Sequence, residues 1–266
     1  MRTIRYYLKI YGMLASQYLK ERMQFRVDFL CEVIGMFFCN VFELLTCWVV
    51  FQNITALGGW NFDEMVFLYG FALLARFPQQ LLLDNAWTLS NKVVNGTFLK
   101  YCFRPVNILF YFMSETVDVK GFTQLLLGSI FMVYSWRKLK IPVTPANLLL
   151  LLFFLVGAAL ICMAMIILSS SFGFLGGGTN SVMFLASTLK DYSKYPLTIF
   201  QKGLRLAFTF VIPVGFIAYY PASFFLTDKG IHPMFVYLSP LIGLLFFLIS
   251  SRVWICLANR YAGTGS

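Results

Sequence analysis

Residues 148–168 read LLLLLFFLVGAALICMAMIIL, a run of apolar residues without a charged side chain. At 1.5 Å per residue, a helix of this length is about 30 Å long, which matches the hydrocarbon core of a bilayer. The whole chain has the same character: 59% of its 266 residues are hydrophobic and 12% are charged, whereas soluble domains are about 25% charged. The sequence therefore predicts an all-α integral membrane protein.

Five further stretches predict five more transmembrane helices, in a single domain that covers residues 1–266. The six expected spans are residues 27–50, 63–83, 119–136, 148–168, 204–220 and 235–252. The fifth contains Pro213 and is expected to be kinked, because proline removes one backbone donor and neighbouring helices in a membrane re-satisfy the freed carbonyl. The glycine cluster GFLGGG at residues 173–178 is expected to end the fourth span and to begin a cytoplasmic connection.

Residues 3–22 place apolar side chains such as Ile4, Tyr11 and Leu19 at helical spacing, with basic residues turned elsewhere. This pattern predicts an amphipathic helix in the membrane interface, where basic side chains meet anionic lipid. A cytoplasmic extension of the first span is the alternative.

Basic residues predict the orientation of the spans, because loops rich in Lys and Arg stay in the cytoplasm. With the N-terminus inside, fifteen of the 21 Lys and Arg fall in inner segments and four fall in outer loops. The inner group includes four residues between the fourth and fifth spans: Lys190, Lys194, Lys202 and Arg205. We therefore expect a multi-pass protein of the inner or plasma membrane, in contact with lipid and with both termini cytoplasmic.

The sequence contains no recognisable catalytic motif. Its one histidine is His232, and the nearest approach to a phosphate-binding loop, at residues 176–179, lacks the lysine that such a loop needs. The six cysteines have the spacing of neither a zinc site nor a disulfide framework. We expect neither an enzyme nor an ATPase, and a chain that binds no metal, cofactor or nucleic acid.

The segment between the second and third spans, residues 84–118, reads DNAWTLSNKVVNGTFLKYCFRPVNILFYFMSETVD and is long and polar for this chain. A turn signal at Asn95-Gly96 is followed by an apolar run and then by Arg104-Pro105. Because most connections are only a few residues long, this length favours a docking element for a soluble partner. A solvated connector is the alternative.

Three charged residues inside the predicted spans require partners, because charge in the hydrocarbon core is costly. Counted from the cytoplasmic ends of their helices, Glu32 lies ~8 Å deep, Arg76 ~10 Å deep and Glu43 ~24 Å deep. Depth therefore favours an ion pair between Glu32 and Arg76. A substrate-path role for Arg76, or an arginine that reaches the interface beside Pro78, remains open.

Two blocks of sequence resemble the type-2 permeases of ATP-binding cassette (ABC) exporters. The first block, similar to an I-x-x-G, spacer, L-x-RP signature, comprises residues 89–92, Gly96, Phe98-Leu99 and Arg104-Pro105. The second, similar to the late signature of a less-studied branch of that family, comprises residues 195–197, Arg205, Pro213-Val214 and residues 220–222. The resemblance covers roughly residues 3–260. Cys102-Phe103 departs from the aliphatic pair more frequent in the family, which leaves the geometry of that loop open.

The resemblance implies a permease that pairs with a second, identical or homologous permease and with two separate ATP-binding subunits, which hold the ATP and Mg. It places a coupling element in residues 84–118, at Lys92, Asn95, Gly96, Lys100, Arg104 and Pro105. It also implies an interfacial N-terminal helix and a short re-entrant helical pair before the last span, which we place at Tyr220-Pro221. The composition suits an amphipathic or lipophilic cargo. Alternatives are a self-sufficient secondary transporter or channel, or a membrane enzyme or scaffold.

Overall fold

The computed structural model describes residues 2–176, 179–226 and 233–261, which form helices and one isolated bridge between Leu57 and Trp60. The longer helices are α1 (Arg2–Arg22), α2 (Arg26–Phe51), α3 (Phe62–Leu82), α7 (Gly121–Lys138), α8 (Pro145–Ser171), α9 (Thr179–Asp191) and α12 (Pro233–Arg260). The short ones are α4 (Leu89–Val94), α5 (Leu99–Cys102), α6 (Ile108–Met113), α10 (Lys202–Leu206) and α11 (Tyr219–Phe225).

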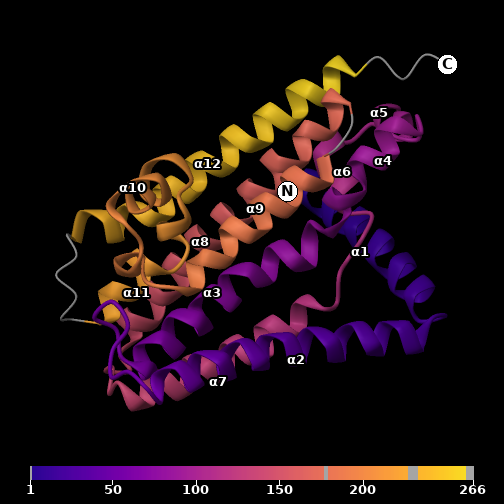
Figure 1. Ribbon diagram of the computed structural model, residues 1–266. Coiled ribbons are helices and arrows are strands. Elements are labelled where there is room, and N and C mark those ends of the chain that lie inside the picture. Colours follow the sequence, from indigo (N-terminus) through magenta and orange to yellow (C-terminus); the bar gives the residue numbers. More distant parts are fainter. Residues whose placement is uncertain (1, 177–178, 227–232, 262–266) are drawn as a thin grey trace.

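The helices form a bundle with two distinct ends (Figure 1). Helices α4, α5 and α6 gather at one end, called here the α4 end, whereas α10 and α11 lie at the opposite, α11 end. Helix α3 packs against both α7 and α8, and α8 packs along α12. Helix α1 meets α2 at a sharp turn near the α4 end. Its Tyr7 hydroxyl lies 3.3 Å from the backbone nitrogen of Asn107, which ties α1 to the start of α6.

Four described helices are long and apolar enough to cross a membrane, namely α2, α3, α8 and α12, or five spans if a bent helical pair counts as one. This confirms an all-α membrane protein. Helix α7 lies beside α3 and is 18 residues long, but it ends in Arg137 and Lys138 and is not among the candidate spans. Six spans therefore stay a prediction.

The region predicted as the fifth span does not form one straight helix. Residues 202–211 and 214–225 are two limbs bent by 73°, with the break at Ile212-Pro213, where proline interrupts the helix. The segment that leads into the first limb already lies at the α11 end, because the Thr198 hydroxyl donates to the Gly58 carbonyl, 2.7 Å away, in the loop between α2 and α3.

The second limb lies at the α11 end as well. The ring of Tyr219 is 5.6 Å from that of Trp60 in the same loop. The chain therefore returns from the α4 end before residue 198, along α9, which packs beside α8.

Because the chain returns along α9, the four basic residues predicted to lie in a cytoplasmic connection between the fourth and fifth spans lie elsewhere. Helix α9 follows the glycine cluster at 173–178, where a connection was predicted. Lys190 and Lys194 consequently lie inside the bundle, and Lys202 and Arg205 lie at the α11 end. Eleven of the fifteen Lys and Arg that were predicted to be cytoplasmic stay assigned to the α4 end. This number is still larger than the number of Lys and Arg assigned to the α11 end.

Glycine sets the closest contacts between the long helices. A Cβ at Gly243 of α12 would lie 2.2 Å from the Gly157 carbonyl oxygen of α8, and a Cβ at Gly157 would lie 2.5 Å from Cα of Pro240. Gly70 of α3 and Gly128 of α7 meet in a similar way, with a Cβ at Gly128 only 3.1 Å from the Gly70 carbonyl oxygen. Small residues let helix backbones approach closely in a membrane, where packing rather than hydrophobicity drives association.

We predict that Gly243→Val destabilises the protein, because the new side chain would have to displace backbone atoms of α8. Overpacking of this kind lowers the free energy of unfolding by about 1–3 kcal/mol. The measurement is the thermal unfolding midpoint of the purified chain. Gly35→Val in α2 is the matched control, since no atom lies within 4 Å of a Cβ there. Equal midpoints for the two variants would contradict the role of the glycine contact.

Candidate functional site

The segment between α3 and α7 folds into a compact cluster of short helices at the α4 end (Figure 1). Its turn is at Gly96, whose φ of +68° is a conformation that side-chain-bearing residues rarely adopt. The backbone nitrogen of Gly96 donates to the Val93 carbonyl, and that of Phe98 donates to the Lys92 carbonyl at 3.0 Å. These bonds fold α5 back against α4, so the turn becomes the tip of the segment.

The tip carries exposed apolar side chains beside basic ones. Phe103 is 82% exposed, and Val94 and Leu99 are exposed as well. Lys100 and Arg104 lie next to them, with the Arg104 guanidinium 5.8 Å from the centre of the Tyr111 ring. Exposed large apolar side chains next to basic ones are typical of a surface that binds another protein.

The underside of the segment is anchored by an aromatic cluster. Phe98 is fully buried, and its ring lies 5.0 Å from Phe174, which follows α8, and 6.0 Å from Trp254 of α12. Tyr261, just after α12, packs against the Phe98 ring and donates a 2.8 Å hydrogen bond to the Val93 carbonyl. Buried aromatic pairs contribute about 0.5–1.5 kcal/mol beyond the area they bury. The segment is therefore attached firmly to α8 and α12.

Glu115, between α6 and α7, joins the parts of the segment through one carboxylate. Lys92 Nζ lies 2.5 Å from Oε2 and Lys100 Nζ lies 2.6 Å from Oε1. The Tyr101 hydroxyl also donates to Oε2, and Asn85 Nδ2 lies 3.3 Å from it. These partners come from α4, from α5 and from the 3₁₀ turn that follows α3. A single side chain thus cross-links the whole segment.

The network fixes the charge of Glu115. Burial raises the pKa of this carboxyl, but hydrogen bonds from Lys100, Lys92 and Tyr101 outweigh burial and lower the pKa to about 2. Partial burial lowers the pKa of Lys92, and the hydrogen bond from Lys92 to Glu115 offsets part of that effect. A carboxylate with a lowered pKa stabilises the fold above its ordinary pKa and loses that contribution only as the pH falls toward 2.

The six residues predicted for coupling all lie in this segment, but they do not share one surface. The exposed ones are Asn95, Lys100, Arg104 and Pro105. Lys92 is half-buried in the Glu115 network, and Gly96 shapes the turn. Sequence reasoning missed Glu115 and Asn85. The available signal is that Glu115 is one of two acidic residues, with Asp118, that follow the last basic residue of the segment, Arg104.

The predicted ion pair between Glu32 and Arg76 does not form. Arg76 Nη1 instead lies 2.6 Å from an Asp191 carboxylate oxygen at the end of α9. Glu32 faces the α4 end, where its carboxylate is 3.7 Å from Arg22 and 3.5 Å from Lys120. The reason is that α9 returns along α8 and the turn after it packs against α3, which brings Asp191 to Arg76.

Glu43 also pairs with the chain that returns along α9. Its two carboxylate oxygens lie 2.6 and 2.5 Å from Lys194 Nζ, and the Tyr69 hydroxyl donates to it at 2.9 Å. Nearer the α4 end, Lys190 donates to the side-chain carbonyl of Gln79.

These groups line the inside of the bundle and are called here the polar ladder. The ladder comprises Glu43 on α2, Tyr69, Arg76 and Gln79 on α3, and Lys190, Asp191 and Lys194 at the end of α9 and the turn after it. From Tyr69 to Gln79 it extends ~15 Å along α3.

The predicted re-entrant turn at Tyr220-Pro221 lies inside α11 rather than at the bend of the helical pair. The bend is at Ile212-Pro213. Tyr220 does connect the two limbs, because its hydroxyl is 2.8 Å from the Thr209 hydroxyl of the first limb. A folded-back pair fits the expected kind of element but begins earlier, at Lys202.

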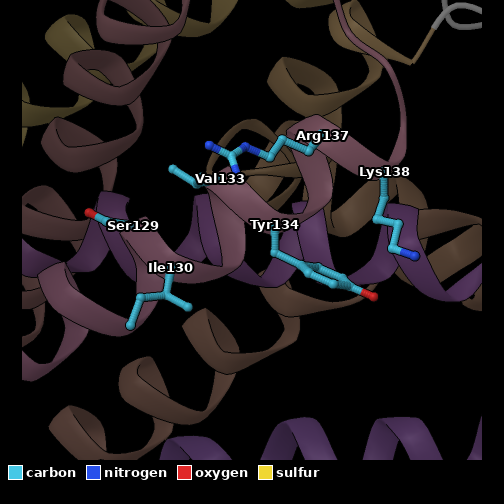
Figure 2. A pocket seen from close by; sticks show the side chains of 6 residues that line it. All are labelled: Ser129, Ile130, Val133, Tyr134, Arg137 and Lys138. Atoms are coloured by element: carbon cyan, nitrogen blue, oxygen red, sulfur yellow. The ribbon is translucent and has the colours of Figure 1, made fainter.

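A hollow on α7 has no features of a binding site. Its lining side chains are Ser129, Ile130, Val133, Tyr134, Arg137 and Lys138. Figure 2 shows that they project from one helix, with the Arg137 guanidinium pointing away from the polar ends of Tyr134 and Lys138. Among the residues that the structure describes, no group of three His, Cys, Asp or Glu could hold a metal ion, and His232 lies outside those residues.

Comparison with protein-family models identifies the family of this chain. A family model described as "ABC-2 family transporter protein" matches residues 37–265. No curated protein and no solved structure matches the chain. The matched range includes the segment between α3 and α7, the polar ladder and the bent helical pair.

We predict that Glu115→Gln loosens the coupling segment, because Lys92 and Lys100 lose their shared carboxylate. Amide exchange of residues 89–104 should become at least about fivefold faster, which corresponds to about 1 kcal/mol of local stability. Exposed Glu21 in α1 provides the control substitution Glu21→Gln. Unchanged exchange in Glu115→Gln would rule out the cross-link. Because three hydrogen bonds outweigh the effect of burial and lower the pKa of Glu115 to about 2, wild-type protection factors should be the same at pH 7 and pH 6 and should decline only below the ordinary pKa of a glutamate.

We further predict that Arg76→Asp reduces the yield of folded protein and that adding Asp191→Arg restores it. Removing one partner of a buried ion pair leaves the other charge without compensation. The measurement is the monodisperse fraction in size-exclusion chromatography. Arg76→Asp combined with Glu32→Arg is the control and should not recover. Recovery with Glu32→Arg but not with Asp191→Arg would overturn the assignment of the pair.

Proposed function

The chain belongs to the ABC-2 family of transporter proteins and is a membrane permease of an ABC transporter, and we propose that it is an exporter subunit driven by ATP hydrolysed on a separate chain. In this proposal two copies of an ATP-binding subunit hold the ATP and Mg. The present chain supplies the passage through the membrane and binds no cofactor itself. It moves an amphipathic or lipophilic substrate out of the cytoplasm.

The observation that carries the proposal is the exposed tip of the segment between α3 and α7. A phenylalanine that is 82% exposed, with Arg104 and Lys100 beside it, suits a groove with an apolar floor and an acidic rim. We therefore assign the ATP-binding subunit to this tip. The α4 end is then cytoplasmic, which agrees with its larger share of basic residues.

The attachment of the tip supports its use as a lever. The aromatic cluster around Phe98 links the tip to α12 and to the end of α8, and Glu115 links it to the start of α7. The segment that carries the tip also follows α3 directly in the chain. A push by the ATP-binding subunit would therefore tilt several spans together rather than bend a loose loop.

The polar ladder supports a path on the side of α2 and α9. The Asp191 side chain is 50% exposed and that of Glu43 is 34% exposed. Charged groups at this depth face protein or water rather than lipid. We propose that a second permease, identical or homologous, faces this side and that the substrate passes between the two. Helix α1 would lie in the cytoplasmic interface of the cell membrane, with both termini inside.

We predict that Arg104→Glu abolishes substrate transport and the stimulation of ATPase activity, while the chain still inserts into the membrane. The substitution places a negative charge where an acidic rim is expected.

Phe103→Ser should weaken co-purification of the ATP-binding subunit by about 5- to 30-fold, as expected when an interface aromatic worth about 1–2 kcal/mol is lost.

Lys138→Glu is the matched control, because Lys138 is an exposed basic residue at the opposite end of the bundle. It should leave co-purification and ATPase stimulation at wild-type levels. Wild-type activity in Arg104→Glu would refute docking at this tip. Transport driven by an ion gradient without any ATP-binding subunit would instead favour a secondary transporter.

A further inference from the structure

We propose that the polar ladder is the site that binds an anionic group of the substrate, so that the cargo is an amphipathic carboxylate or phosphate. This inference rests on the proposed transport function and adds the chemical class of the substrate. It follows from three observations on the ladder: its charge balance, the unused donors of Arg76, and the partial exposure of its two carboxylates.

The ladder holds more cations than anions. Arg76, Lys190 and Lys194 carry three formal positive charges, against the two carboxylates Glu43 and Asp191. Lys190 is 5% exposed, and the hydrogen bond of its ammonium goes to the neutral side chain of Gln79. A buried cation next to an amide lacks the compensation that an anion supplies. An anionic ligand would provide the missing charge.

Two hydrogen-bond donors of the Arg76 guanidinium have no acceptor among the described residues. This residue is 6% exposed, and its Nη1 contacts Asp191. Its Nε and Nη2 are buried, and no described residue accepts a hydrogen bond from either. These two nitrogens form the edge of the guanidinium that binds a carboxylate or a phosphate through two parallel hydrogen bonds. A buried donor without an acceptor is costly, which favours a state in which an anion reaches this edge.

Asp191 and Glu43 show how an anion could reach the cations. Each holds a buried cation, and each side chain is itself partly exposed, Glu43 on α2 and Asp191 at the end of α9. An anionic group that reaches Arg76 can bind the Nε and Nη2 edge that Asp191 leaves free, and its charge then balances the third cation. Glu43 and Asp191 compete with such a ligand for the same cations, so removal of the Glu43 charge should favour binding.

The test uses the purified full chain in zwitterionic lipid nanodiscs and a pair of matched fluorescent probes, dansyl-undecanoate and dansyl-undecylamine. The anionic probe should bind more tightly than the cationic one after subtraction of binding to empty nanodiscs. Lys190→Gln should weaken binding of the anionic probe roughly tenfold and Glu43→Gln should strengthen it, because each changes the charge of the ladder by one in opposite directions. A merely structural role would weaken binding in both variants.

Lys202→Gln, an exposed basic residue on α10, is the control and should bind like the wild type. Competition by dodecyl phosphate but not by inorganic phosphate would identify an amphipathic anion, and competition by both would identify a bare anion site. Equal binding of the two probes, or a loss of binding in both ladder variants, would overturn the proposal. Binding needs no ATP-binding subunit, so this result is independent of the docking test at Arg104.

Discussion

Hydrocarbon cannot hydrogen-bond to protein, and this constraint governs every part of the molecule that lies in the membrane. Backbone groups must be satisfied within helices, which explains why the described chain is helical throughout its long elements. Charged side chains must find partners inside the bundle, which explains why Arg76, Lys194 and Glu43 are all paired. The return of the chain along α9 is what makes this pairing possible.

The two candidate sites use the same physics for different purposes. At the α4 end, Glu115 satisfies two lysines and a tyrosine, and an aromatic cluster fills the space below them. The result is a stiff block with an exposed tip. In the ladder, by contrast, two donors of Arg76 are unused and the hydrogen bond of Lys190 goes to an amide. A fully satisfied network suits the transmission of force, whereas a partly satisfied one suits exchange of a ligand.

The fold changes most the prediction that rests on the count of Lys and Arg on each side of the membrane. Counting basic residues assumed that the glycine cluster at 173–178 began a cytoplasmic connection and that residues 204–220 crossed the membrane. Helix α9 is short and has charged residues at its end, so its hydropathy does not mark it as a span. The run at 204–220 is apolar enough to resemble one, but Pro213 breaks it and both limbs pack at one end. Apolar composition alone does not distinguish a crossing from a folded-back pair.

The sequence by itself determined the membrane class, four of the long helices to within a few residues, and the unusual length of the segment at 84–118. These properties follow from local composition and from the thickness of a bilayer. Only the tertiary structure decided which charges meet, because partners such as Arg76 and Asp191 are more than a hundred residues apart and come together through the path of α9. Depth along a helix did not give the direction in which Glu32 points, which is toward Arg22 and Lys120 rather than Arg76. The contacts of a membrane-buried charge depend on which helices are neighbours, and no local pattern in this chain encodes that arrangement.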